Sequence, residues 1–235
     1  MLARLSDPVV ARCNICGGTE FEPGPRGRPS PDGGPPRCVN CGSLERHRAL
    51  RRAFVLIPQP MLAWRRALQF APDSSLDESW FRSFEGSEYG GENSIDMQAI
   101  DRPDGSYDFI SLSLVLEFVP DDRGAFSELL RVGSDDLILH LTFNSGLTGE
   151  ESSHTEEPSG EYGHYHDYGR DFEQRFETAE RGLSTLIIEI PDPVTGDVTY
   201  PFCFLCRRRI DAETLAAAFE AEPAASLESL TRVPG

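Results

Sequence analysis

The segment Tyr107-Asp-Phe-Ile-Ser-Leu-Ser, residues 107–113, has a strong strand pattern and follows the turn-forming Arg102-Pro-Asp-Gly. Residues 121–132, with Pro120 just before them, predict a helix, and residues 137–143 predict the next strand. A strand, a helix and another strand in succession are typical of a parallel sheet covered by helices. This stretch therefore predicts an α/β fold.

The alternation of strand and helix continues on both sides of this stretch. Two late strands joined by Pro191-Asp-Pro-Val-Thr-Gly predict an antiparallel edge on a mostly parallel sheet, whose ligands would lie at the carboxyl ends of the strands. In chain order we expect a helix over 44–57, a strand over 67–71, a short helix over 76–84, a strand over 84–89, a mobile polar loop over 145–163, a helix over 171–179, strands over 183–190 and 199–205, and a helix over 212–221 followed by a loose tail.

Two Cys-x-x-Cys pairs, Cys13/Cys16 and Cys38/Cys41, each have a glycine directly after the second cysteine. Such a glycine lets the backbone turn tightly around the thiolates, and four thiolates suit tetrahedral zinc. The Pro-, Gly- and Arg-rich segment between the pairs has little that could form a core, so a metal would be needed for folding. We predict a structural zinc ribbon, with a redox dithiol pair or an iron centre as the alternatives.

The third pair, Cys203 and Cys206, lies in the apolar run Tyr200-Pro-Phe-Cys-Phe-Leu-Cys. Positions three apart in a strand point to opposite faces. We therefore interpret these cysteines as buried free thiols, with a further metal site as the alternative.

The charge of the chain is unevenly spread. The net charge is −17, yet residues 1–66 hold 11 Arg against 5 acidic residues, and residues 67–235 hold 11 Arg against 34. The acidic body disfavours nucleic acid, and complementarity within the chain is the simplest interpretation. There is no lysine, which excludes lysine Schiff bases and the Walker lysine.

The helix expected over 44–57 has an apolar face and an arginine face with Arg46, Arg48, Arg51 and Arg52. That arginine face could bind phosphate or an acidic partner, or pack on the acidic body. The predicted domains are a zinc ribbon over 1–45, an Arg-rich connecting helix over 46–60, an α/β domain over 61–210, and a helix and tail over 211–235. The first residues lack the apolar stretch of a signal peptide, and no apolar run is long enough to span a bilayer, so we expect a cytoplasmic protein without a membrane partner.

Five ordered pieces of the sequence resemble bacterial class I S-adenosylmethionine-dependent methyltransferases that carry an N-terminal zinc ribbon. The pieces are Cys38-Val-Asn-Cys-Gly-Ser-Leu-Glu-Arg-His-Arg, Leu68-Gln-Phe-Ala-Pro-Asp, Tyr107-Asp-Phe-Ile with Val115-Leu-Glu-Phe-Val-Pro-Asp-Asp-Arg, His164-Tyr-His-Asp-Tyr-Gly-Arg-Asp-Phe, and Phe202-Cys-Phe-Leu-Cys-Arg-Arg. The resemblance implies a seven-stranded Rossmann-like sheet and a pocket for S-adenosylmethionine. The sequence departs from the usual pattern in lacking the Gly-x-Gly loop, in having Phe118 where His is common, and in showing no clear third strand.

The resemblance also implies which residues bind the cofactor. It places Ala71, Pro72 and Asp73 in the loop after the first strand and Glu88 on the ribose hydroxyls. It places Asp96 and Met97 beside the adenine, and Ser111 and Ser113 after the fourth strand.

Methyl transfer to oxygen or nitrogen requires a proton acceptor near the methyl acceptor. His164 is the candidate general base, since imidazole titrates near neutrality. Tyr168 and Arg170 complete the expected catalytic set, with Arg170 holding an anionic substrate or forming a salt bridge with Asp167 or Asp171. We expect His140 to be a satisfied core residue, Glu117 to be structural, and His47 to support the zinc knuckle.

The leading hypothesis is a methyltransferase acting on a small-molecule or saccharide-like acceptor. The alternatives are a non-catalytic methyltransferase-like protein whose ribbon and Arg-rich helix dock a partner protein, and a zinc-ribbon nucleic-acid adaptor, which the acidic body opposes.

Overall fold

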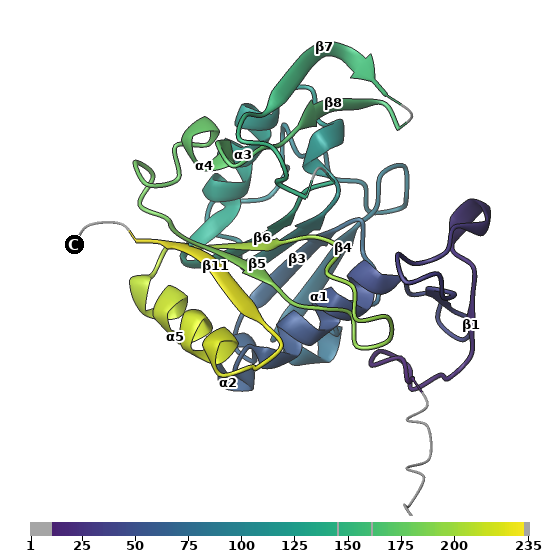
Figure 1. Ribbon diagram of the computed structural model, residues 1–235. Helices are drawn as coiled ribbons and strands as arrows, with labels where there is room; N and C mark the ends of the chain where they lie inside the picture. Colours follow the sequence, from purple (N-terminus) through teal and green to yellow (C-terminus); the bar gives the residue numbers. More distant parts are fainter. Residues whose placement is uncertain (1–10, 145, 161, 233–235) are drawn as a thin grey trace, which may run out of the picture.

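The computed structural model describes residues 11–144, 146–160 and 162–232. A central sheet carries helices on both faces, and the N-terminal segment forms a small separate ribbon at one side (Figure 1). None of the described helices has the length and apolar character that crossing a lipid bilayer requires.

The central sheet has seven strands in the order β11-β9-β10-β6-β5-β3-β4. Its strands are β3 (Arg66–Phe70), β4 (Ser83–Ser87), β5 (Tyr107–Ser113), β6 (Gly133–Thr142), β9 (Ser184–Glu189), β10 (Phe202–Cys206) and β11 (Ser226–Thr231).

The strands β4, β3, β5 and β6 pair in parallel. Strand β10 runs antiparallel to both β6 and β9, and β11 is antiparallel to β9. The mixed α/β fold, with a parallel centre and an antiparallel edge, is therefore confirmed. Because β4 and β5 lie on opposite sides of β3, the chain reverses its direction of travel across the sheet at β3, and such a switch point opens a crevice at the carboxyl ends.

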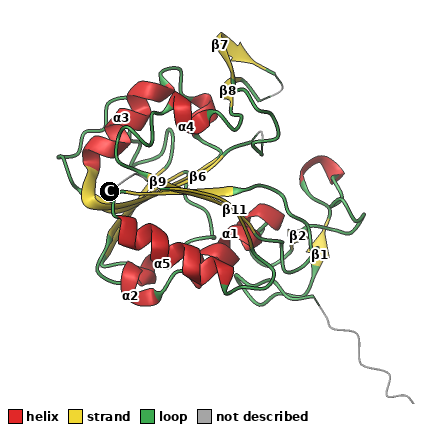
Figure 2. Ribbon diagram, turned by 60° about the vertical axis from the view of Figure 1, so that its left-hand side comes forward, coloured by secondary structure: helices red, strands yellow, loops and turns green. Residues whose placement is uncertain are grey.

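Two helical layers cover the sheet (Figure 2). One layer holds α1 (Glu45–Leu56), α2 (Gln59–Leu62) and α5 (Arg209–Glu220). The other holds α3 (Asp122–Val132) and α4 (Phe172–Arg175). Side chains alternate between the two cores, so that Phe109 of β5 packs in the core under α1 and Ile110 packs in the core under α3. The body thus includes α1 as part of its packing, while the exact domain boundaries stay a prediction.

The third cysteine pair and His140 both belong to the core. Cys203 and Cys206 are fully buried on β10 and pack in different cores, as their spacing predicts. His140 is fully buried, and its two ring nitrogens lie 2.9 Å from the Ser111 hydroxyl and 3.0 Å from the Thr142 hydroxyl. Burial lowers the pKa of His140 to about 3, so the ring is neutral.

The expected mobile loop over 145–163 is the region where the fold differs most from expectation. A hairpin of β7 (Ser153–Ser159) and β8 (His164–Asp167) stands beyond the sheet beside the α3 and α4 layer (Figure 1). Every side chain of β7 is exposed, so the strand lacks the alternation of polar and apolar residues by which strands are recognised.

Three further expectations were wrong. The tail forms β11, whose pairing covers the edge of β9. The helix expected over 171–179 ends after Arg175, because Glu177 adopts a left-handed φ of 51°. The helix expected over 76–84 is only the 3₁₀ turn η2 (Glu78–Trp80). The sheet has seven strands, the number that the resemblance implied. Residues 88–106 form turns and add no strand beyond β4. The seventh strand is β11, at the edge opposite β4.

Candidate functional site

The four N-terminal cysteines form a compact cluster in the ribbon, next to its short hairpin of β1 (Phe21–Glu22) and β2 (Arg37–Cys38). The Sγ atoms of Cys13 and Cys41 are 3.7 Å apart, and those of Cys16 and Cys38 are 3.5 Å apart. Tetrahedral zinc with Zn–S bonds of about 2.3 Å separates its sulfur ligands by about 3.8 Å. The cluster therefore has the spacing of a closed four-thiolate site.

The glycines after the second cysteines allow this geometry. Gly17 and Gly42 adopt φ of 76° and 71°, and their N–H groups donate to the carbonyls of Cys13 and Cys38. The N–H of Gly18 points at the sulfur of Cys16, 3.4 Å away. Both turns are therefore backbone knuckles of the expected kind.

The arginines of α1 attach the ribbon to the body. Arg48 is fully buried and donates to both carboxylate oxygens of Asp192, at 2.8 and 2.6 Å, and to the carbonyls of Pro36 and Ser43 in the ribbon. Arg51 pairs with Asp77, and Arg52 with Glu222. The charge asymmetry of the sequence is thus partly complementarity within the chain.

His47 caps α1 through its side chain. Its Nδ1 accepts a hydrogen bond from the N–H of Leu44, and its Nε2 lies 3.8 Å from Asp73. Burial lowers the pKa of His47 to about 4, which keeps the ring neutral and able to accept.

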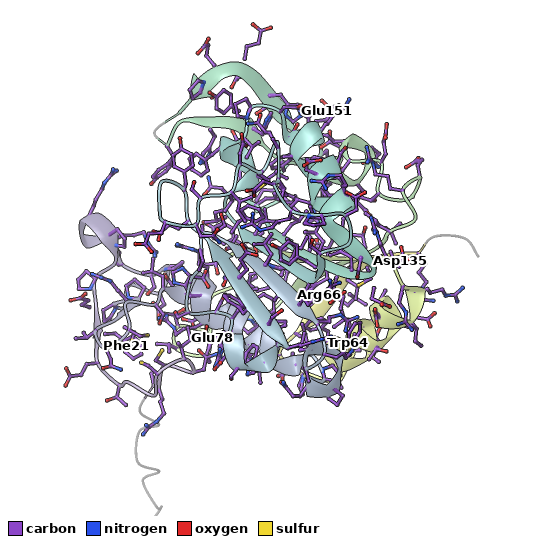
Figure 3. All side chains as sticks on the ribbon, turned by 180° about the vertical axis from the view of Figure 1, so that it is seen from behind. Phe21, Trp64, Arg66, Glu78, Asp135 and Glu151 are labelled. Carbon is purple, nitrogen blue, oxygen red and sulfur yellow. The ribbon has the colours of Figure 1, made fainter. Side chains whose placement is uncertain are left out.

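A cavity of about 790 Å³ opens at the carboxyl ends of three neighbouring strands. Phe70 and Ala71 line it at the end of β3, Ser87 and Tyr89 at the end of β4, and Leu114 after β5. Its remaining walls are residues 94–98 on one side and Val115, Phe118, Val119, Pro120 and Tyr165 on the other. Arg66 and Asp135 lie near the amino ends of β3 and β6, away from this cavity (Figure 3).

Two non-glycine residues at this cavity adopt left-handed backbone conformations. Ala71 has φ of 48° and Leu114 has φ of 58°, directly after β3 and β5. Hydrogen bonds from Ala71 N–H to the Ser87 carbonyl and from Leu114 N–H to the Thr142 carbonyl hold them in place. Such conformations are costly and concentrate at functional sites.

The residues expected to bind the cofactor are only partly brought together. Ala71, Asp96 and Met97 line the cavity, with Met97 buried and Asp96 exposed. The other five lie outside its lining among the described residues, namely Pro72, Asp73, Glu88, Ser111 and Ser113.

These five residues are engaged elsewhere or face solvent. Pro72 lies so close to Gly86 that a Cβ there would be 2.8 Å from the proline ring. Asp73 accepts hydrogen bonds from Ser75, and the Ser111 hydroxyl is bonded to buried His140. Glu88 follows β4 and is exposed, and Ser113 is half-buried at the end of β5.

The expected catalytic residues do not converge on one point. His164 is largely buried, and its ring packs edge-on against Phe118 of the cavity wall, with centroids 4.7 Å apart. Tyr168 is buried and donates a 2.9 Å hydrogen bond to Asp122. Arg170 donates to the Leu147 carbonyl and pairs with Glu228, not with Asp167 or Asp171.

Sequence reasoning missed the environment of Glu117. This carboxyl is fully buried after β5, accepts a hydrogen bond from Asn144 N–H, and has no partner for Oε2 among the described residues. Burial raises the pKa of Glu117 to about 7. An acidic residue inside the apolar run Val115-Leu-Glu-Phe-Val was the available signal.

No protein-family model matches the chain, and no curated protein matches it. Among solved structures, an S-adenosylmethionine-dependent methyltransferase from Thermotoga maritima is similar, with 12% identity, 68% of this chain and 89% of that chain covered, and a TM-score of 0.44. One from Mesorhizobium loti shows 9% identity, coverage of 66% and 96%, and a TM-score of 0.43. The 1,6-didemethyltoxoflavin-N1-methyltransferase from Burkholderia thailandensis, with S-adenosylhomocysteine bound, shows 9% identity, coverage of 68% and 78%, and a TM-score of 0.45. These structural neighbours are all methyltransferases.

Proposed function

We propose that this chain is an S-adenosylmethionine-dependent methyltransferase acting on a small molecule. The observation that carries the proposal is the cavity at the carboxyl ends of β3, β4 and β5, where the order of the sheet switches. Open α/β sheets bind their ligands at this position. Its volume of about 790 Å³ lies in the range typical of cofactor and substrate sites.

The lining of the cavity suits a nucleoside cofactor. Asp96 offers a carboxylate that can accept from an amino or hydroxyl group, and buried Met97 offers an apolar surface to a flat ring. Ala71 adopts the left-handed conformation for which glycine is the usual residue. Its side chain is only a methyl group, so it takes up little space. The missing Gly-x-Gly loop is therefore compatible with a close approach of ligand to backbone.

The other end of the cavity suits a small acceptor with apolar or aromatic character. Phe118, Val119, Pro120 and Tyr165 line this end. When bound, S-adenosylmethionine supplies an activated methyl group on a sulfonium, and the acceptor loses a proton as it takes up that methyl. We assign the role of proton acceptor to His164, which is packed on Phe118. Tyr168 and Arg170 then act as positioning residues, since each holds another part of the protein.

Zinc in the ribbon is the second part of the proposal. The sulfur spacing supports it, and four thiolates leave no open position for a substrate, so the metal would be structural. Arg48 joins this ribbon to the body. The alternative of a partner-docking ribbon has less support, because Arg48, Arg51 and Arg52 are already bonded within the chain.

Isothermal titration calorimetry of the full chain with S-adenosylmethionine and S-adenosylhomocysteine tests the cofactor. We expect measurable binding, weakened about 10- to 100-fold by Asp96→Ala, the range for a lost hydrogen bond to a charged group. Asp135→Ala is the matched control, an exposed aspartate near the amino end of β6. If the folded wild-type protein binds neither ligand, the methyltransferase proposal is wrong.

Native mass spectrometry of the same protein tests the zinc. Zinc in the ribbon is expected, so Cys16→Ser should hold one zinc per chain fewer than the wild type, whereas Cys206→Ala, which changes a core cysteine, should hold the same number. A metal-free wild-type ribbon that stays folded would contradict this assignment.

A further inference from the structure

The cross-strand pair His154 and His166 faces Asp122 of α3, outside both sites described above. The two histidines are register partners of β7 and β8, and their Nδ1 atoms are 2.8 Å apart. One ligand atom each from His154, His166 and Asp122 lies within 4.8 Å of the others. His166 and Asp122 are buried, whereas His154 is exposed.

The protonation of His166 follows from its second nitrogen. Nε2 lies 2.8 Å from the Val119 carbonyl, which can only accept, so Nε2 carries the hydrogen. The Nδ1 of the neutral ring therefore presents a lone pair toward His154. Histidines that bind metals characteristically donate their other N–H to a carbonyl or carboxylate in this way.

Asp122 is similarly held. Its Oδ2 accepts from the Tyr168 hydroxyl at 2.9 Å and from Arg175 Nε at 2.7 Å, while Oδ1 accepts from Arg175 Nη2 at 2.6 Å. A carboxylate has about four lone-pair positions, so one on Oδ1 remains. Oδ1 also lies 3.9 Å from Nε2 of His166, the ring nitrogen on the Val119 side, so Asp122 lies against the edge of this ring.

We propose that His154, His166 and Asp122 bind a divalent transition metal such as zinc. Two imidazoles and one carboxylate suit zinc, iron, cobalt or nickel, whereas calcium and magnesium prefer oxygen ligands throughout. In a tetrahedral site, metal–ligand bonds of about 2.0–2.2 Å place neighbouring ligand atoms about 3.3–3.6 Å apart, so the two histidine nitrogens, now 2.8 Å apart, separate slightly on binding.

Three protein ligands leave room for water or substrate, and exposed His154 puts that open position on the solvent side. The hairpin stands beside α3 and α4 in Figure 1. Val119, whose carbonyl holds His166, also lines the cavity, so the metal would lie next to the acceptor end.

Titration with Co²⁺ of the full chain carrying a single equivalent of zinc, which the four thiolates of the ribbon take up first, tests this site. We expect one added equivalent with visible d–d absorption and without the near-ultraviolet thiolate band that cobalt in the ribbon would give. His154→Ala should weaken this equivalent at least about tenfold, and its exposed position makes a folding defect unexpected. Glu156→Ala, also at an exposed position of β7, is the matched control and should bind as the wild type does.

His166→Gln gives a second measurement, because the amide can still donate to Val119 but cannot replace the imidazole as a ligand. It should keep the near-ultraviolet circular dichroism of the wild type and lose the cobalt signal. No added equivalent in the wild type, or undiminished binding by His154→Ala, would mean that the two histidines form a hydrogen-bonded pair only. Because no methyl donor is present, failure here leaves the methyltransferase proposal untouched.

Discussion

Two regions of the molecule differ in how their buried polar groups are paired. One is the junction between the ribbon and the body, and the other is the carboxyl end of the sheet. At the junction, fully buried Arg48 makes four hydrogen bonds, two of them to the carboxylate of Asp192. At the carboxyl end, Glu117 is equally buried, yet its Oε2 has no partner in the described part of the chain. The backbone differs too, since Ala71 and Leu114 adopt left-handed conformations there.

This difference in pairing indicates that the junction serves stability and the carboxyl end serves a site. A charge that is buried and fully paired holds the chain in one arrangement. Unpaired polar groups and strained backbone persist where a fold gives up some stability for a site. We therefore expect substitutions at the junction to act mainly on stability, and substitutions at the carboxyl end to change pH dependence or to relieve strain.

The largest effect should come from Arg48→Met, which leaves the Asp192 carboxylate buried without its partner. Breaking one side of a buried ion pair typically costs 3–5 kcal/mol of unfolding free energy, measurable by urea denaturation. The control Arg209→Met removes an exposed pair with Glu213 and should cost about 0.5 kcal/mol or less. Equal losses of unfolding free energy in Arg48→Met and Arg209→Met would show that the buried pair at the junction contributes no more than a surface pair. The double variant Arg48→Met/Asp192→Leu should recover part of the loss.

An intermediate effect is expected for Glu117→Gln. The folded pKa of Glu117, about 7, lies above the ordinary value of 4.5, so the folded state holds this proton more tightly than the unfolded state does. Its contribution to stability is therefore greatest below pH 4.5 and is lost as pH rises toward 7. Glutamine removes that loss, so the variant should gain at most about 3 kcal/mol relative to wild type between pH 4.5 and 8. Exposed Glu92→Gln serves as the control, and a parallel pH profile for both variants would contradict the environment described for Glu117.

The smallest effect should come from Ala71→Gly. Glycine removes the cost of a left-handed alanine, about 1–2 kcal/mol, but adds about 0.4–1 kcal/mol of unfolded-chain entropy. A net gain of roughly 0.5 kcal/mol in unfolding free energy is expected by urea denaturation. Ala217→Gly, on the exposed side of α5, should instead lose about 1 kcal/mol. Destabilisation of similar size in both variants would show that Ala71 is unstrained.

The parts of the fold that were predictable from sequence are those with strong local patterns. The strand over 107–113 matches β5, and the cysteine spacing predicted both knuckles and the opposite faces of Cys203 and Cys206. The hairpin was missed because β7 is exposed along its whole length and has no local alternation to reveal it, and β11 is defined by its pairing with β9.

The site was less predictable because it depends on loops that meet only in three dimensions. Ala71, Asp96 and Met97 reach the cavity wall as the resemblance implied, whereas Ser111 turns toward His140 on the face of β5 under α1. Arg170 had nearby acidic residues as candidate partners, yet it pairs with Glu228, which lies 58 residues away on β11. Partners supplied by distant strands leave no trace in the local sequence.

The bonds of Arg48 also set an order of assembly. Its two carbonyl partners lie 5 and 12 residues away, but Asp192 lies 144 residues away, in the turn between β9 and β10. The bonds from Arg48 to the ribbon carbonyls can therefore form early. The bond from the Arg48 guanidinium to Asp192 has to wait for the turn between β9 and β10. Closing so long a loop is slow, because contacts distant in sequence form late. We therefore expect the ribbon to dock late in folding, after β9 and the turn that carries Asp192 have formed.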